Sequence, residues 1–143
     1  MSDNDFVTQL FRMIRINVRS KGKRNEFRAV AAFRGQFRDV PSWFRGIRNA
    51  TNEQDSKGID VVVRTDMGEI LVQIKSSVLG ADRFRLEQGN GRYGKDIAVI
   101  VITEGLCHRH VRDAIVSGIF GAYEKMRHAN STMYLSQVTE PLH

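Results

Sequence analysis

The feature that most constrains the fold is the segment GIDVVVRTDMGEILVQIKSS, from Gly58 to Ser77. Two β-rich runs, IDVVVRT and EILVQIKSS, surround the turn DMG, and this pattern predicts a β-hairpin. Three polar residues interrupt the runs: Asp60 heads the first, and Gln73 and Lys75 lie two residues apart in the second. Because a polar group inside a sheet is costly unless it has a partner or a role, these residues need an explanation.

The remaining periodicities predict helices and further strands on both sides of this hairpin. We expect helices over about residues 5–17, 24–37, 81–88 and 106–126, and strands at SWFRGIRNA, DIAVIVIT and TMYLSQV. TNEQDSKG is expected to be a polar loop, DIAVIVIT a central buried strand because it is apolar on both faces, and TMYLSQV an edge strand. The predicted fold is α/β, with a mixed central sheet of about four to five strands flanked by helices.

Length and composition predict one ordinary globular domain over residues 1–143, with its core over about 23–126. No linker-like stretch or internal repeat divides the 143 residues. No apolar run approaches the ~18 residues needed to cross a bilayer, and the polar N-terminus is unlike a signal peptide. The single cysteine, Cys107, cannot form an internal disulfide. We therefore expect a cytoplasmic protein without a membrane segment.

Positive charge is concentrated in one part of the chain. Residues 11–48 contain eleven Lys and Arg against two acids, a charge of +9, whereas the whole chain carries only +6. Clustered Lys and Arg indicate a polyanion partner, because their contacts with phosphates release counterions. Nucleic acid is the partner that this asymmetry favours over a merely solvated basic face.

The polar residues of the hairpin are predicted to gather at one place. Alternation along a strand puts Asp60 on one face of the first run, and Gln73 and Lys75 on one face of the second. Glu26 lies on the apolar stripe of the second helix, where it either complements the helix dipole or joins these residues by covering their face. Carboxylate and amide oxygens are ligands for Mg²⁺ or Mn²⁺, and a nearby lysine suits phosphodiester hydrolysis.

This arrangement resembles the PD-(D/E)XK nuclease superfamily, which includes restriction endonucleases and Holliday-junction resolvases. The helix Glu matches Glu26, the strand Asp matches Asp60, and the X-Lys pair matches Ile74 and Lys75, over roughly residues 23–103. The resemblance implies a restriction-endonuclease-like core and a Mg²⁺- or Mn²⁺-dependent DNA endonuclease, with structure-selective cutting as in resolvases. It implies metal ligation by Asp60, Gln73, the Ile74 carbonyl and Glu26, and a catalytic Lys75.

Two positions depart from the family pattern. Ile59 stands where Pro is common, and Gln73 stands where the family usually has an acid, which removes one negative charge and should weaken metal binding. Some active members resemble this chain in having Gln there. An acidic loop before GID also resembles some members, which puts Asp55 at the edge of the site. The alternatives are a catalytically inactive nucleic-acid-binding module on the same fold and a structural subunit with a basic docking face.

The expected DNA contacts, to duplex or branched substrate, come from the basic segment and from the loop GNGRYG and the lysine that follows it. The candidate nucleic-acid-binding residues are Lys21, Lys23, Arg24, Arg28, Arg45, Arg48, Arg92 and Lys95. Although GNGRYG satisfies the glycine spacing of a dinucleotide-binding loop, it precedes a strand instead of following one, so we do not expect a nucleotide cofactor. Resolvase-like enzymes often act as dimers, so the resemblance also allows a homodimer.

Overall fold

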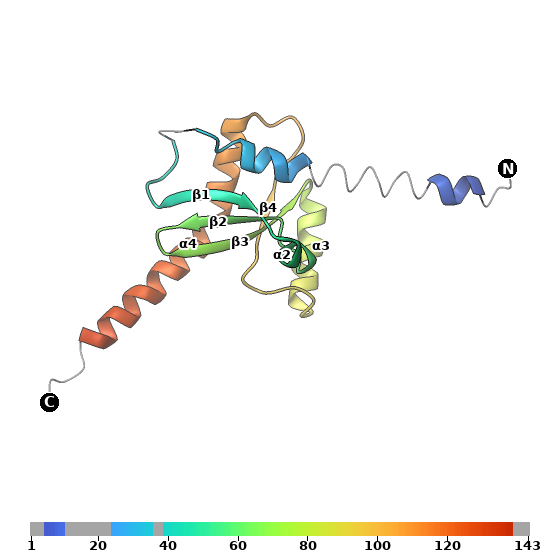
Figure 1. The fold of residues 1–143 in the computed structure, drawn as a ribbon. Coiled ribbons are helices and arrows are strands. Elements are labelled where there is room, and N and C mark those ends of the chain that lie inside the picture. Colours follow the sequence, from blue (N-terminus) through green and yellow to red (C-terminus); the bar gives the residue numbers. More distant parts are fainter. Residues whose placement is uncertain (1–4, 11–23, 36–38, 139–143) are drawn as a thin grey trace.

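The computed structural model describes residues 5–10, 24–35 and 39–138 (Figure 1). Helices over residues 5–10 and 24–31 come first in this part of the chain. They are followed by β1 (Phe44–Asn49), α2 (Asn52–Ser56), β2 (Val61–Thr65), β3 (Gly68–Lys75), α3 (Val78–Gly89), β4 (Ala98–Val101) and α4 (His108–Val138). None of the helices in these ranges combines the length and apolar character needed to cross a membrane.

The four strands form one mixed sheet in the order β1-β2-β3-β4. The pairs β1–β2 and β2–β3 are antiparallel, and β3–β4 is parallel with α3 as the crossover. The predicted hairpin is present, with Val61 opposite Val72 and the turn closed at Gly68, whose φ of 131° suits glycine. The expectation of an α/β fold with a mixed sheet flanked by helices is confirmed.

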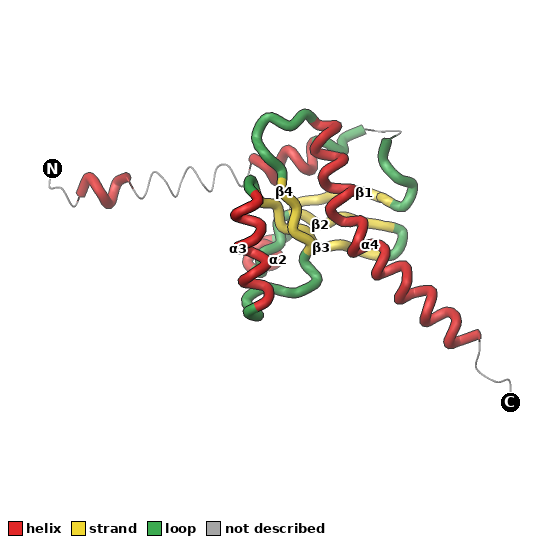
Figure 2. Tube along the Cα trace, turned by 180° about the vertical axis from the view of Figure 1, so that it is seen from behind, coloured by secondary structure: helices red, strands yellow, loops and turns green. Residues whose placement is uncertain are grey.

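Alternate residues of the central strands supply two separate cores. Val61 and Val63 pack with Ile115 of α4 and with the helix over residues 24–31. Val62 packs on the other face with Phe84 of α3. Figures 1 and 2 show the sheet between these helices, with α4 across one face and α3 beside β3 and β4. Helices therefore pack on both faces of β4 and of the C-terminal part of β3, while the part of β3 around Glu69 is exposed.

The C-terminal part of the prediction was wrong. TMYLSQV is not a strand but the last part of α4, which runs 31 residues from His108 to Val138 and projects beyond the sheet (Figure 2). No proline or glycine interrupts this stretch after Gly121, so nothing ends the helix there. Gly118, which weakens the helical pattern, has a packing role: a Cβ at this position would lie 2.8 Å from Ile100 Cγ1 of β4.

Three other expectations need correction. DIAVIVIT forms the edge strand β4 instead of a central one; it is apolar because helices cover both of its faces, not because strands flank it. TNEQDSKG is not a plain loop, since it contains α2. The second helix ends at residue 31, before a turn that reaches Gly35 with φ 101°, and the predicted continuation to 37 falls partly outside the described residues. The N-terminal helix is described only over 5–10.

Candidate metal and phosphodiester site

Three carboxylates meet at the end of the sheet where β2 begins and β3 ends. Glu26, Asp55 and Asp60 each offer an oxygen, and these oxygens all lie within 4.8 Å of one another. They come from the helix over residues 24–31, from α2 and from the residue before β2. Glu26 and Asp60 are half-buried and Asp55 is exposed. The arrangement thus brings together the two predicted acids and the residue that the family resemblance put at the site's edge.

Asp60 lies at an irregularity in strand pairing. Ile59 and Val62 share one core although they are three residues apart, so strict alternation is broken between them. The Asp60 N–H donates to the Val72 carbonyl at 2.8 Å, and its carboxylate Oδ2 accepts from the Ile74 N–H at 2.8 Å. The carboxylate therefore takes the place of a ladder partner for β3, which fixes its position at the strand end.

The surroundings of Asp60 shift its proton affinity in opposite directions. Burial raises the pKa of the Asp60 carboxyl above its ordinary value of 3.8, because the charged form loses water. Hydrogen bonds from the Ile74 N–H and with Glu26, and the positive charge of Lys75, lower this pKa, while the charge of Asp55 raises it. A bound cation would add to the positive charge of Lys75 and would favour the ionised form of this carboxylate.

Asp55 is held in place by a local motif. Thr51 caps α2, its hydroxyl accepting from the Gln54 N–H, and the Gln54 side chain accepts from the Thr51 N–H. Such a reciprocal capping box stabilises a helix start, so the spacing Thr-x-x-Gln was the signal for a helix here. Gly58, with φ 84°, then turns the chain into β2. Sequence reasoning placed Asp55 only at the edge of the site, because it missed this helix.

Glu26 reaches the cluster from the opposite side to that expected. Its helix packs through Ala29, and the following turn through Ala32, against the core on the α4 face of the sheet, not over the face that bears Lys75. Side-chain hydrogen bonds to backbone oxygens fasten this helix: Asn25 to Ile102 (3.4 Å), Arg28 to Leu106 (2.7 Å) and Arg112 to Ala32 (3.0 Å). Glu26 therefore meets Asp60 over the end of the sheet, in a position set by anchors distant in sequence.

Gln73 is buried at 7% exposure, and its Nε2 lies 3.4 Å from the Ile74 carbonyl oxygen, a long hydrogen bond. Gln73 brings no charge, but Asp55 supplies a third carboxylate to the cluster. The cluster thus holds three carboxylates without an acid at position 73.

Lys75 is on the α3 face of the sheet, as alternation predicts. Its Nζ lies 5.5 Å from the centre of the Phe84 ring, and Phe84 in turn stacks on Tyr93 with ring centres 4.4 Å apart. A cation over an aromatic ring is attracted by the ring's quadrupole. The lysine that completes the predicted site is therefore positioned by a buried aromatic residue of α3.

The donor set fits a hard divalent cation. Three carboxylates from three elements are the oxygen ligands that Mg²⁺ and Mn²⁺ prefer. Neighbouring ligands in an octahedral Mg²⁺ shell lie about 3 Å apart and opposite ligands about 4.2 Å apart, since each bond is about 2.1 Å long. The three oxygens lie within 4.8 Å of one another, so they would move closer together on binding one ion.

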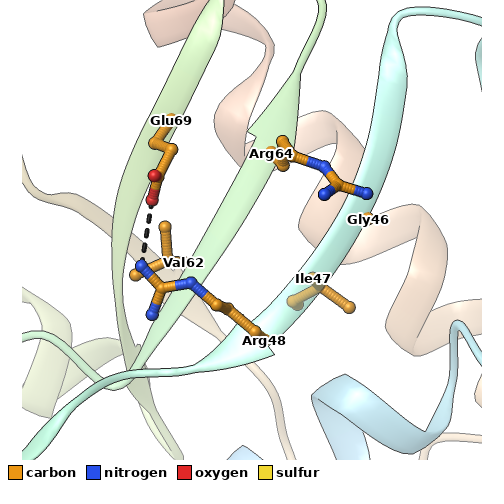
Figure 3. A pocket seen from close by; sticks show the side chains of 6 residues that line it. All are labelled: Gly46, Ile47, Arg48, Val62, Arg64 and Glu69. Carbon is orange, nitrogen blue, oxygen red and sulfur yellow. Dashed lines mark hydrogen bonds and ion pairs between the residues drawn. The ribbon is translucent and has the colours of Figure 1, made fainter.

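The candidate DNA-contacting residues differ in their exposure and in their partners. Lys21 and Lys23 lie outside the described residues, while Arg24, Arg45 and Lys95 are exposed. Arg28 donates to the Leu106 carbonyl, and Arg92 pairs with Glu87 at 3.0 Å. Arg48 pairs with Glu69 at 3.0 Å across the open part of the sheet, where Arg64 lies nearby (Figure 3).

Comparisons of this chain with models of protein families, with curated proteins and with solved structures found no match.

Proposed function

We propose that this protein is a Mg²⁺- or Mn²⁺-dependent DNA endonuclease that hydrolyses phosphodiester bonds. The observation that carries the proposal is the meeting of the Glu26, Asp55 and Asp60 carboxylates at a strand end, with the positive charge of Lys75 acting on Asp60. Negative oxygen ligands beside a lysine suit a reaction in which charge develops on a phosphate.

The order of elements supports a PD-(D/E)XK nuclease core. A helix bearing Glu26 precedes a meander of three strands, followed by α3 and by β4, which is parallel to β3. This is the order that the resemblance of the sequence to that superfamily implies. The +9 charge of residues 11–48 supports a nucleic-acid substrate.

Each residue of the site would have a separate role in metal binding or in hydrolysis. Asp60, Glu26 and Asp55 would hold the metal ion, and the Ile74 N–H keeps the Asp60 carboxylate oriented toward it. When bound, the ion lowers the pKa of a coordinated water and offsets charge on the phosphate. Lys75 donates hydrogen bonds to the attacking water or to a non-bridging phosphate oxygen, with Phe84 limiting its motion. Gln73 and the Ile74 carbonyl would complete the oxygen donors.

One observation favours a second candidate function, a catalytically inactive nucleic-acid-binding module. The amide of Gln73 donates to the Ile74 carbonyl, which the family pattern uses as a metal ligand. That bond uses the Gln73 Nε2 group and one lone pair of the Ile74 carbonyl oxygen, so it competes with a metal ion for the carbonyl. The two functions differ in cleavage but not in the salt-dependent binding of DNA.

The test is a cleavage assay on duplex, branched and single-stranded DNA with Mg²⁺ or Mn²⁺. Asp60→Asn keeps an acceptor for the Ile74 N–H but removes the charge, and Lys75→Ala removes the ammonium. Both should abolish cleavage, while Asp96→Asn, at an exposed acid before β4, should leave it intact. Cleavage that survives both site substitutions would refute the assignment, and binding without cleavage in the wild type would favour the inactive module.

A further inference from the structure

The loop between α3 and β4 places one aromatic ring against two parts of the candidate site. Tyr93 stacks on Phe84 with the ring centres 4.4 Å apart and an angle of 15° between the ring planes. The edge of the Tyr93 ring also lies against the backbone of Gly58, where an added Cβ would be 2.7 Å from the Tyr93 Cδ1 and 3.3 Å from the Phe84 Cε2. Figures 1 and 2 show α2, which ends just before this glycine, beside α3. The loop, α3 and the turn between α2 and β2 therefore meet at one ring.

The turn that the ring contacts joins two of the carboxylates. Gly58 lies three residues after Asp55 and two before Asp60. Its N–H donates to the Asp55 carbonyl at 3.0 Å, and its φ of 84° directs the chain from α2 to β2. Because a glycine has no side chain, the Tyr93 ring packs directly on this backbone. A shift of the turn would move Asp55 relative to Asp60, so the ring helps to set the separation of their oxygens.

The same stack reaches Lys75. The Lys75 Nζ lies 5.5 Å from the centre of the Phe84 ring, and a Cβ added at Gly80 would lie 3.7 Å from the Lys75 Cδ. The lysine stem thus packs along the first turn of α3 and its ammonium lies over a ring of the same helix. Phe84 is only 3% exposed, and the half-buried Tyr93 ring covers one of its faces. Loss of the Tyr93 ring would give Phe84 room to tilt and would loosen its contact with the ammonium.

Bonds to the end of α3 hold the loop that carries Tyr93. The Gln88 Nε2 donates to the Gly94 carbonyl at 2.9 Å, and the Arg92 N–H donates to the Glu87 carbonyl at 3.0 Å. The Arg92 guanidinium pairs with the Glu87 carboxylate at 3.0 Å and lies 5.3 Å from the centre of the Tyr93 ring. None of these partners is a carboxylate of the metal cluster or the lysine. The ring is therefore anchored independently of the groups that it contacts.

We propose that Tyr93 is a positioning residue for the metal ligands and for the lysine of the site. Its ring fixes the turn between Asp55 and Asp60. Through Phe84 it also limits the motion of the Lys75 ammonium. The proposal rests on the proposed nuclease function, because it assigns a residue to the same site. The ring carries this role, since the Tyr93 hydroxyl makes no hydrogen bond within residues 5–10, 24–35 and 39–138.

The test compares Tyr93→Leu, which removes the flat ring, with Tyr93→Phe, which removes only the hydroxyl. In a calorimetric titration Tyr93→Leu should bind Mn²⁺ about tenfold more weakly than the wild type, because groups that orient metal ligands typically contribute this much. At Mn²⁺ concentrations that saturate each protein it should also cut DNA about a hundredfold more slowly, since the lysine is no longer held in place. Tyr93→Phe should match the wild type in both measurements. Tyr93→Met, which keeps much of the volume but not the flat ring, is a second variant with the same expected losses.

Trp43→Leu is the matched control for a general loss of stability. Trp43 is also half-buried and stacks on a tyrosine, with ring centres 4.2 Å apart. Its carbonyl accepts from the Asp66 N–H, at the other end of β2 from Asp60. This variant should unfold at a lower temperature than the wild type but keep the Mn²⁺ affinity and the cleavage rate. Every measurement is made at a temperature at which thermal unfolding shows the variants to be folded.

Unchanged Mn²⁺ affinity in Tyr93→Leu or Tyr93→Met, or an equal loss in Trp43→Leu, would overturn the proposal. A loss in Tyr93→Phe as large as in Tyr93→Leu would also overturn it, because the hydroxyl and not the ring would then act. Cleavage that needs Asp60 but not the Tyr93 ring would leave the nuclease standing and reject only the positioning role. Mn²⁺ binding that needs the ring, in a protein that cuts no DNA, would reject the nuclease and support the positioning of the metal ligands.

Discussion

The carboxylate cluster predicts that removing one of its charges stabilises the metal-free protein. In Asp60→Asn the amide oxygen still accepts from the Ile74 N–H, so the strand end keeps its hydrogen bond. The oxygens of the cluster lie within 4.8 Å of one another, and at an effective dielectric constant of about 20 two unit charges at that distance repel by about 3.5 kcal/mol. Partial protonation of the cluster, the lost attraction to Lys75 and a weaker hydrogen bond offset much of this repulsion. We expect a net gain of about 1–2 kcal/mol.

Thermal unfolding in EDTA and in excess Mn²⁺ measures this gain. In EDTA the variant should unfold about 3–8 °C above the wild type, by the usual relation between free energy and Tm for a chain of this size. In Mn²⁺ at a hundred times its dissociation constant the wild type should gain about 2.7 kcal/mol and the variant far less, so the order reverses. Asp96→Asn should follow the wild type in both conditions.

The pH dependence gives a second check on the same variant. Burial raises the pKa of Asp60 above 3.8, so its contribution to wild-type stability is present below that pH and is lost as the pH rises through the raised value. Asparagine does not titrate, and the advantage of the variant in EDTA should therefore shrink as the pH falls through the raised pKa, and should be smallest below 3.8. A variant less stable than the wild type in EDTA at neutral pH, with an unchanged response to Mn²⁺, would refute the reasoning.

Other predictions concern the support of the site. Gly58→Ala should cost about 2–4 kcal/mol in urea unfolding, because its φ is 84° and the new Cβ would lie 2.7 Å from a ring carbon of the stacked tyrosine. Gly91 has the same φ, but a Cβ there would have no atom within 4 Å, so Gly91→Ala should cost about 1 kcal/mol. Equal losses of stability in the two variants would show that the contact with the tyrosine ring adds no cost at Gly58. Burial, and then the hydrogen bond that the Tyr123 hydroxyl donates to Asp66, raise the pKa of Tyr123 above 10.0, so stability should be lost as the pH rises above 10. Tyr123→Phe should abolish this loss of stability at alkaline pH. If the variant and the wild type lose stability equally above pH 10, the Tyr123 hydroxyl is not its cause. Gln73→Glu should tighten Mn²⁺ binding in a calorimetric titration, and weaker or equal affinity would exclude position 73 from the ligands.

The hairpin and its polar residues could be predicted because the signals are local. Alternation and a Gly-containing turn specify β2 and β3, and the Asp at the head of one strand and the Lys at the end of the next follow from their positions alone. The mixed sheet could also be predicted from the sequence, because a helical segment between two strands favours a parallel crossover.

The errors concern elements whose environment is set by distant parts of the chain. DIAVIVIT has the composition of a central strand, but its apolar residues are buried by helices, which periodicity cannot distinguish from strands. TMYLSQV has β-forming residues, yet it continues an existing helix, and extending a helix needs no new nucleus. The side from which Glu26 approaches depends on hydrogen bonds to residues 77 or more positions away, and no local pattern reports them.

Those distant anchors also set when the site can exist during synthesis. Asn25 binds the Ile102 carbonyl and Arg112 binds the Ala32 carbonyl, across separations of 77 and 80 residues. At translation rates of about 5–20 residues per second, the anchors of the helix that carries Glu26 are made about 4–15 s after that helix. A nascent chain can already hold the β1–β2–β3 meander and Asp60 while it lacks the third carboxylate. The cluster is thus completed only after Ile102 and Arg112 have been synthesised and can bind this helix.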